Sequence, residues 1–166
     1  MKLFPSSASR FLSMKLVFVC ALYFSLVAIS NILDFGTNFE FVKHVLSMDT
    51  LFSGEVLTSR AITNPLWHQI LYIMIIIWES IAALGLWYAG FQLFKSRNQN
   101  AAVYKRAKNI ALYALSIGLL LWFFVFITVG GEYFLMWRSE DWNGIDAAFR
   151  MFSIMGIVAL LVQNTE

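Results

Sequence analysis

Glu79 is the residue of this chain whose type and position point most directly to chemistry. It lies near the middle of the longest apolar stretch, residues 66–94. A carboxylate at the centre of a membrane-spanning helix costs roughly 2.5–3.5 kcal/mol on insertion scales, and by default it marks a functional site. Such a group can bind a ligand or carry a proton. Alternatively, in its protonated form, it can simply hydrogen-bond a neighbouring helix.

Helical periodicity places two further polar side chains on the same face as Glu79. At about 3.6 residues per turn, His68 and Tyr72 share a stripe with Glu79 and with the small residues Ala83 and Gly90. Small residues mark the packing faces of membrane helices because they let two backbones approach closely. We therefore expect Glu79 to point into a helix bundle, with His68 roughly 16 Å further along the axis.

Two charged residues from other segments complete the predicted site. Glu132 and Arg150 are both expected near the same membrane boundary as His68. There they form either a structural ion pair with each other or part of a binding site. The sequence thus predicts a polar cleft with His68, Glu132 and Arg150 at its mouth and with Tyr72 and then Glu79 below. We interpret these five residues as a ligand-binding site, without assigning a catalytic residue.

No motif for covalent or metal chemistry accompanies these residues. The sequence contains no Walker motif, GxGxxG fingerprint, nucleophile–base pair or metal-ligand box. Its one cysteine, Cys20, excludes an intramolecular disulfide, a CxxC redox pair and a thiolate zinc site. His44 and His68 lack supporting ligand spacing, so no metal is predicted. Trp78 and Trp122 are interpreted as packing residues. No cofactor is predicted, although haem and quinone remain open.

Composition indicates the elements that must position these side chains. The 166 residues are 60% hydrophobic and 13% charged, with a mean hydropathy of +0.70, whereas soluble domains carry about 25% charged residues. The formal charge of +2 is too small to suggest a nucleic-acid partner. We predict an all-α membrane protein with a single domain, residues 1–166. Four segments are long enough to cross about 30 Å of hydrocarbon, namely residues 16–33, 66–94, 107–129 and 145–162.

The distribution of Lys and Arg predicts the orientation of this four-helix bundle. These residues concentrate near the N-terminus and between the second and third segments, whereas the other two loops carry most of the acids. By the positive-inside rule, both termini are expected in the cytoplasm. An alternative makes the first segment a cleaved signal peptide, because Lys15 precedes an apolar run and Ala28-Ile29-Ser30 resembles a cleavage site.

The first outer loop, residues 34–64, carries a structural pattern of its own. Thr37 and Glu40 form a capping-box pattern, and the apolar residues that follow occupy one half of a helical wheel. We predict a short amphipathic helix over residues 38–48, which either covers the bundle or shields a site beneath it.

Local signals also predict where the long helices begin and end. Asn64 and Pro65 are an N-cap and a first helical residue, and Asn143 is a second N-cap. Gly130-Gly131 is expected to end or bend the third segment; if the helix continues past it, Thr128 and Glu132 extend the stripe of Ala107, Ala111, Ala114 and Gly118.

Several strings resemble one bacterial family, the predicted small integral membrane proteins called domain of unknown function 2165. The resemblance covers about residues 15–162 and implies a four-span protein of the bacterial inner membrane that keeps its first span. It implies no activity. The strings are DFGTNF (34–39), FVKHVLSMDT (41–50), RAITNP (60–65), Trp78-Glu79, VGGEYFLMW (129–137) and WNGIDAAFR (142–150).

Three functional hypotheses follow from the sequence. The first is a non-enzymatic accessory or assembly subunit of a larger membrane complex, with membrane lipids and other membrane protein subunits as partners. It rests on small size, absent catalytic motifs and abundant aromatic surface. The alternative is a ligand- or proton-binding carrier for a quinone, a lipid or a small solute, with its site at Glu79. The remote third is a haem-dependent membrane oxidoreductase.

Overall fold

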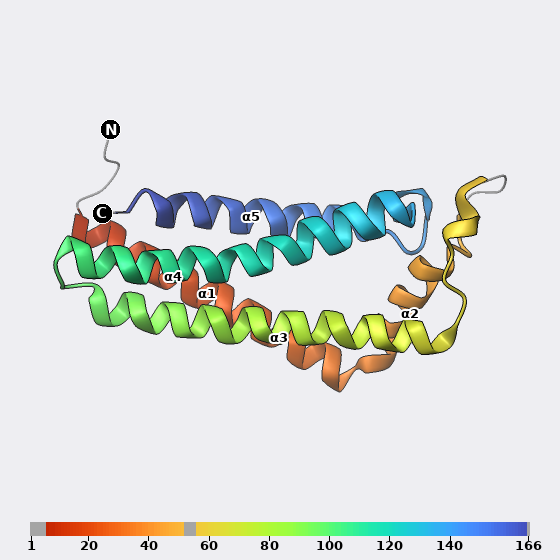
Figure 1. Ribbon diagram of the computed structural model, residues 1–166, viewed down its shortest axis with the longest axis horizontal. Helices are drawn as coiled ribbons and strands as arrows, with labels where there is room; N and C mark the ends of the chain where they lie inside the picture. The colour runs from red at the N-terminus through yellow and green to blue at the C-terminus, as the bar shows by residue number, and fades with distance from the viewer. Residues whose placement is uncertain (1–5, 52–55, 166) are drawn as a thin grey trace.

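Four long helices form the body of the protein. The computed structural model describes residues 6–51 and 56–165, and in these ranges four helices are long and apolar enough to cross a membrane. Both termini and the turn between α3 and α4 lie at one end of the bundle (Figure 1). The predicted all-α four-helix fold is therefore confirmed. The long helices are α1 (Ser6–Leu33), α3 (Pro65–Ser96), α4 (Ala101–Leu120) with its continuation η2 (Leu121–Tyr133), and α5 (Ile145–Gln163).

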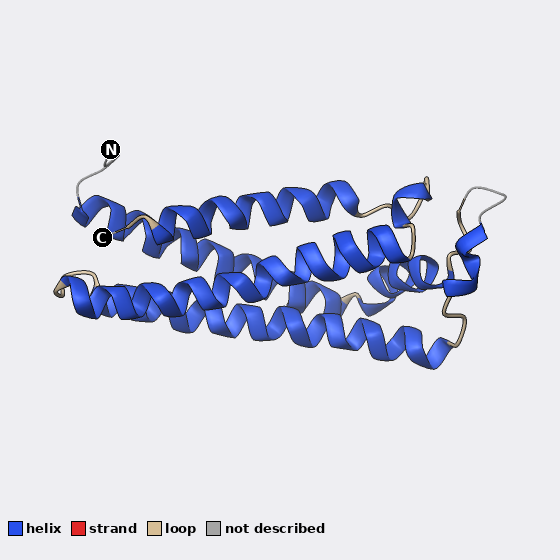
Figure 2. Cartoon of the chain, turned by 45° about the horizontal axis from the view of Figure 1, so that its top comes forward, coloured by secondary structure: helices blue, strands red, loops and turns tan. Residues whose placement is uncertain are grey.

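Short helices gather at the opposite end (Figure 2). They are α2 (Phe35–Ser47), η1 (Val56–Arg60) and η3 (Met136–Arg138). We call this the capped end. The other end, which carries both termini and the α3–α4 turn with Lys95, Arg97 and Lys105, is called the basic end.

The predicted short helix in the first loop is present, but it begins earlier than expected. Asp34 occupies the N-cap position of α2. Thr37 is the third residue of the helix, and its hydroxyl donates to Asp34 Oδ1 at 3.0 Å. The prediction that Thr37 caps the helix is therefore wrong. On the apolar face, Val42 and Leu46 are buried, as amphipathicity predicts.

The other predicted helix starts are close to those observed. The side chain of Asn64 accepts a hydrogen bond from the backbone N–H of Leu66, and Pro65 opens α3, which confirms that prediction. At α5 the cap residue is Gly144. The prediction that Asn143 is the N-cap is therefore wrong by one residue, although Asn143 accepts from the N–H of Ile145 at 3.1 Å.

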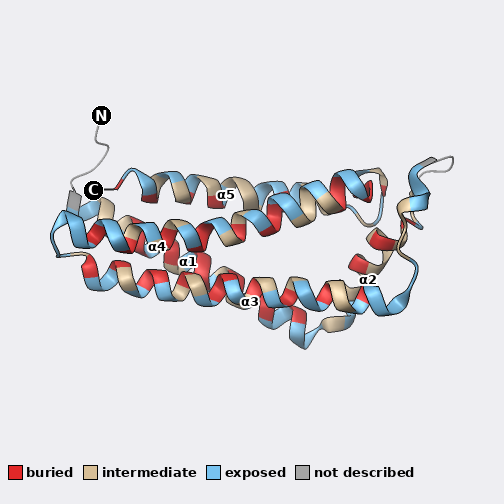
Figure 3. Cartoon of the chain, viewed as in Figure 1, coloured by how far each residue is buried: buried red, intermediate tan, exposed pale blue. Residues whose placement is uncertain are grey.

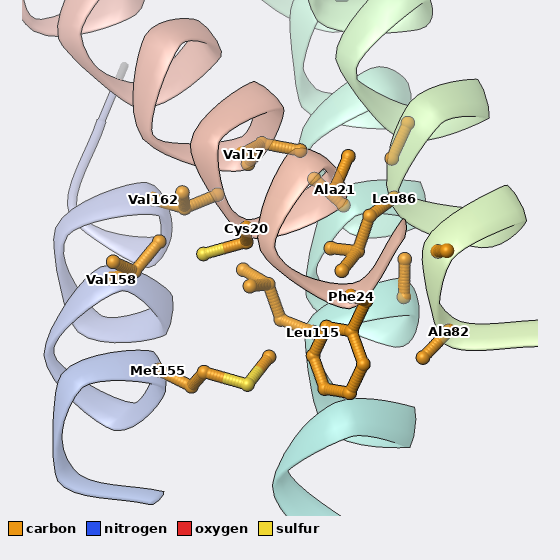
Figure 4. Close-up of a cluster of buried hydrophobic side chains, with 14 of the residues drawn as sticks. Val17, Cys20, Ala21, Phe24, Ala82, Leu86, Leu115, Met155, Val158 and Val162 are labelled. Atoms are coloured by element: carbon orange, nitrogen blue, oxygen red, sulfur yellow. The ribbon is translucent and has the colours of Figure 1, made fainter. Parts of the chain in front are cut away.

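Small residues bring the long helices together in the half of the bundle near the basic end. Ala83 and Gly90 of the predicted stripe on α3 are buried, and so are Ala107, Ala111, Ala114 and Gly118 on α4. Buried segments recur along both helices in Figure 3. At Gly118 an added Cβ would lie only 2.8 Å from the ring of Phe24, so a glycine is required there. Larger side chains fill the remaining space, among them Phe24, Leu86, Leu115 and Met155 (Figure 4).

The third long helix continues past Gly130-Gly131, so of the predicted end or bend at these glycines the end is wrong. Beyond Leu120 it widens into a π-helix that continues to Tyr133. The two glycines instead allow close packing, since a Cβ at Gly131 would lie 2.6 Å from Ile145 Cδ1. A π-helix closes i→i+5 hydrogen bonds and so turns less per residue than an α-helix. Thr128 and Glu132 consequently leave the stripe of Gly118 and are exposed.

The long helices differ in length, which leaves room at the capped end. The 32 residues of α3 span about 48 Å at 1.5 Å per residue, well beyond the ~30 Å of a hydrocarbon core. α1 ends at Leu33, and α2 then packs against the remaining turns of α3 through Val42, Leu46 and Tyr72. A short helix thus replaces a long one beside the outer part of α3.

Candidate functional site

Glu79 is buried and hydrogen-bonded to a residue of α1. Only 1% of its surface is exposed. The side-chain amide of Asn31 donates to Glu79 Oε2 at 2.7 Å, and the amide of Asn38 donates to Asn31 Oδ1 at 2.8 Å. The hydroxyl of Tyr72 donates to the backbone carbonyl of Asn31 at 3.3 Å. Asn31 therefore joins α1, α2 and α3 at one point.

Asn31 also sets the depth of Glu79 in the bundle. It lies in the last turn of α1, just before the exposed Asp34. Glu79 is central in α3, but the bond to Asn31 places it level with the end of α1. α1 therefore ends beside the middle of α3, and the carboxyl group lies where α1 gives way to α2.

A cavity of about 470 Å³ lies beside this hydrogen-bonded group. Glu79 and Tyr72 line it, as do Asn31 and Asn38. The remaining lining residues come from α1, α2, α3, η2 and the start of α5: Tyr23, Leu26, Val27, Ser30, Phe41, Val42, Ile75, Trp122, Phe126, Gly144 and Ala147.

Exposed residues of the lining show where the cavity opens. Leu26 and Ser30 belong to α1, and Ala147 belongs to the first turn of α5. All three are exposed, and so is the lining residue Asn38 of α2. The opening therefore lies on the side of the bundle between α1, α2 and α5, near the capped end. α2 contributes Phe41 and Val42 to the wall, so this short helix covers the bundle and also shields the cavity.

Two polar groups that belong to buried side chains of the cavity wall have no hydrogen-bond partner among the described residues. The indole N–H of Trp122 is buried and makes no hydrogen bond. Glu79 uses Oε2 for Asn31, and its Oε1 has no hydrogen-bond partner among the described residues. The side chains lining the cavity include no Lys, Arg or His. Besides the amides of Asn31 and Asn38 and the hydroxyl of Ser30, the wall thus offers one carboxyl group, one indole donor and several aromatic rings.

His68 lies on the predicted face but outside the cavity lining. Only 4% of its surface is exposed, and its Nε2 lies 2.6 Å from the carbonyl oxygen of Ile62. A carbonyl can only accept, so Nε2 carries the proton and donates. His68 thereby fixes the segment that leads into α3.

Glu132 and Arg150 do not take the positions expected of them. Both are exposed, neither lines the cavity, and no ion pair joins them in the described part of the chain. Glu132 is turned outward by the wide helix η2, and Arg150 points away from the bundle on α5. The predicted pair at the mouth is replaced by Ser30, Asn38 and Ala147.

Asn31 and Trp122 line the cavity and supply polar groups to it, but the sequence does not predict them as site residues. An amide in the last turn of an apolar helix resembles an ordinary helix end, and Trp122 resembles a packing residue. The available signal for Asn31 was its polarity within a segment, residues 16–33, that is otherwise apolar except for cysteine, serine and tyrosine.

A second cavity of about 370 Å³ adjoins the first. Its lining is apolar apart from the indole of Trp78, whose N–H donates to the carbonyl of Ile117 at 3.0 Å. The two cavities share four lining side chains: Phe41, Val42, Ile75 and Phe126.

The described residues contain no group of three or more His, Cys, Asp or Glu that could bind a metal ion. His44 lies in α2 beside acids, with Nδ1 2.9 Å from Asp49 Oδ1. Its ring stacks on Trp142, with centroids 4.7 Å apart. This pair attaches α2 to the segment that precedes α5.

Comparison with known proteins identifies the family and nothing more specific. The family described as "Predicted small integral membrane protein (DUF2165)" matches residues 9–165. No curated protein and no solved structure matches the chain. Since the match covers almost the whole sequence, this chain belongs to the family of small integral membrane proteins called domain of unknown function 2165.

Proposed function

We propose that the protein is a membrane-embedded binding protein that takes a small lipophilic molecule into the cavity at Glu79. The observation that carries this proposal is the pair of unpartnered polar groups, Glu79 Oε1 and Trp122 Nε1, in the wall of one cavity. An unsatisfied buried donor or acceptor costs about 1–3 kcal/mol. Polar groups of a bound ligand would give both atoms a partner.

The simpler alternative is that Glu79 only joins α3 to α1. That role needs one oxygen, Oε2, and the amide of Asn31. It explains neither the cavity of about 470 Å³ nor the free indole N–H of Trp122. Ligand sites combine a mostly apolar wall with a few converging polar groups, and this cavity has that character.

The opening favours a ligand that arrives from the bilayer. Leu26 lies at the opening and is 55% exposed, and the neighbouring apolar cavity extends the space available to hydrocarbon. A lipophilic molecule with a polar group could place that group at Glu79 and leave its apolar part against Phe41, Val42 and Phe126.

The proposal is tested by the small molecules that purify with the protein. Full-length protein in a mild detergent is extracted with organic solvent, and the extract is analysed by mass spectrometry. We expect a molecule at near-stoichiometric amount in wild type, reduced at least about tenfold in Glu79→Gln and also reduced in Trp122→Phe. The matched control is Trp87→Phe, because the Trp87 N–H already donates to Ser25 Oγ at 3.0 Å, outside this cavity. Equal recovery from all four proteins, or no molecule from any, refutes the proposal.

A second candidate is an accessory or assembly subunit of a larger membrane complex. One observation favours it: Tyr113, within α4, is 74% exposed, and its hydroxyl has no partner in the described part of the chain. A hydroxyl that faces hydrocarbon is satisfied by a polar group of another protein. Mild-detergent purification that returns only monomer, with no second protein, would count heavily against this role.

We further propose the bacterial inner membrane as the location, with the basic end in the cytoplasm. The described part of the basic end carries Arg10, Lys15, Lys95, Arg97, Lys105, Arg106 and Lys108, whereas the capped end carries most of the acids. This asymmetry is the one that the positive-inside rule associates with cytoplasmic termini.

A further inference from the structure

We propose that the ligand of this cavity is a lipophilic amine whose ammonium group lies beside Glu79. This inference rests on the proposed binding function and specifies the chemical class of the ligand. Its basis is the charge and the aromatic character of the cavity wall.

The charges of the wall favour a cation and oppose an anion. Among the lining residues Glu79 is the one carboxylic acid, and no basic side chain lines the cavity. The one Lys or Arg of α2, Lys43, is paired with Glu40 at 2.8 Å. A phosphate or carboxylate in the cavity would have no countercharge. An ammonium group, in contrast, supplies the partner that a carboxylate needs in an environment of low dielectric constant.

Aromatic rings occupy much of the same wall. Tyr23, Trp122 and Phe126 follow one another, with ring centroids 6.3 Å apart for the first two and 4.9 Å apart for the last two. Phe41 from α2 and Tyr72 from α3 also line the cavity. Aromatic faces attract organic cations, and cages of such rings recognise quaternary ammonium groups. A carboxylate among aromatic rings, with no basic residue, therefore matches an ammonium group better than any anion.

The unpartnered indole N–H adds one requirement. Trp122 Nε1 is a donor without an acceptor, and an ammonium group cannot accept its hydrogen bond. A ligand oxygen near the nitrogen, as in an amino alcohol or an amino ester, would accept this bond. A neutral alcohol or quinol could also hydrogen-bond to Glu79 and Trp122, so the presence of positive charge is the property to test.

The test uses two probes of nearly the same shape that differ in charge. Benzyltrimethylammonium carries a positive charge, and neopentylbenzene replaces its nitrogen by carbon. Binding of each to full-length protein in maltoside micelles is measured by tryptophan fluorescence, for wild type, Glu79→Gln and Glu132→Gln. Glu132 is an exposed acid outside the cavity, so its variant is the matched control. Each probe partitions into the micelles to the same extent with all three proteins. The ratio of a probe's affinities for wild type and Glu79→Gln therefore measures the effect of the Glu79 carboxyl group alone.

We expect Glu79→Gln to weaken binding of the cation at least tenfold and to leave binding of the neutral probe unchanged. Glu132→Gln should bind both as wild type does. Equal effects of Glu79→Gln on the two probes, or no binding of the cation to wild type, overturns the inference. Neither result affects the proposed binding function, which depends on the co-purifying molecule; a co-purifying molecule without an amine would overturn the amine assignment alone.

An ammonium group could come from a free amine or from an aminophospholipid head group. Competition against benzyltrimethylammonium separates these sources, with dodecylamine and lysophosphatidylethanolamine as the competitors. We expect the amine to displace the probe at lower concentration, because the lipid phosphate finds no basic partner in the wall. Displacement by the phospholipid alone would support the lipid head group as the source, and displacement by neither would overturn the inference.

Discussion

The side-chain amide of Asn31 joins three helices at one point. It donates to Glu79 on α3 and accepts from Asn38 on α2, while its own backbone belongs to α1. Replacing it by leucine would leave Glu79 Oε2 buried without a donor, and an unsatisfied buried acceptor costs about 1–3 kcal/mol, or more if charged.

We therefore predict that Asn31→Leu lowers the free energy of unfolding by at least about 1–3 kcal/mol. The measurement is unfolding in detergent micelles followed by circular dichroism. Ser30→Ala is the control, since Ser30 is the adjacent residue, is exposed, and makes no side-chain hydrogen bond within the described residues. If Asn31→Leu is as stable as Ser30→Ala, Asn31 is not what holds Glu79 in place.

At the residue scale, helical phase was enough to predict some of the site. His68, Tyr72 and Glu79 are buried on one face of α3, as their spacing indicates. Asn31 could not be found in this way, because its role depends on where α1 ends relative to α3. Which residues of two helices lie at the same level depends on the lengths and tilts of both helices. The periodicity of one helix gives no information on either.

The glycines of the helices show which elements approach closely. A Cβ at Gly118 would lie 2.5 Å from Met155 Cε and 2.8 Å from the ring of Phe24, whereas a Cβ at Gly156 would have no atom within 4 Å. Overpacking of a core typically costs about 1–3 kcal/mol. In an open position, alanine is better than glycine in a helix by about 0.5–1 kcal/mol.

Gly118→Ala is thus expected to lower the unfolding free energy by about 1–3 kcal/mol. The same substitution at Gly156, on α5, should be neutral or slightly stabilising. Both are measured by thermal unfolding in the same micelles. A Gly118→Ala protein as stable as Gly156→Ala would mean that α1, α4 and α5 can separate at this point without loss.

The wide helix η2 explains why the site differs from the predicted one at Glu132. The predicted face of Glu132 assumes a rotation of 100° per residue across residues 121–133, where the chain instead forms i→i+5 hydrogen bonds. The hydroxyl of Thr128 donates to the carbonyl of Phe123, five residues earlier, at 3.0 Å. Nothing in the apolar sequence LWFFVFIT signals this change, so every face assigned beyond Leu120 was rotated.

At the element scale, the position of α2 depends on contacts with the segment before α5. Trp142 stacks on His44 and lies edge-on to Phe41, with centroids 4.7 and 6.2 Å apart. We predict that Trp142→Ala loosens α2, seen as faster amide hydrogen exchange over residues 35–47, while exchange at the basic end stays unchanged. Trp137→Ala is the control, because Trp137 is 47% exposed and does not contact α2 through a ring pair. Unchanged exchange in α2 would show that Trp142 does not hold it.

Over the whole molecule, differences in helix length separate a packed half from a hollow one. Near the basic end all four long helices meet, with Val17, Ala21, Leu86, Ala111 and Leu115 fully buried. Near the capped end α1 has ended, and α2 is too short to fill its place. The composition and the apolar lengths of the sequence predicted the four helices, but the cavity results from how their unequal ends are combined.

The distribution of charge between the two ends predicts the topology of the molecule. Asn98 lies in the α3–α4 turn at the basic end, and Glu140 lies between η3 and α5 at the capped end; both are exposed. Because Lys and Arg near short loops favour the cytoplasm, a thiol at position 98 should face inward and one at position 140 outward. In intact spheroplasts, a membrane-impermeant maleimide should label Glu140→Cys and leave Asn98→Cys unlabelled until the membrane is opened. Wild type is the blank, since Cys20 is buried. Labelling of Asn98→Cys alone would reverse the orientation and place the opening beside Glu79 on the cytoplasmic side.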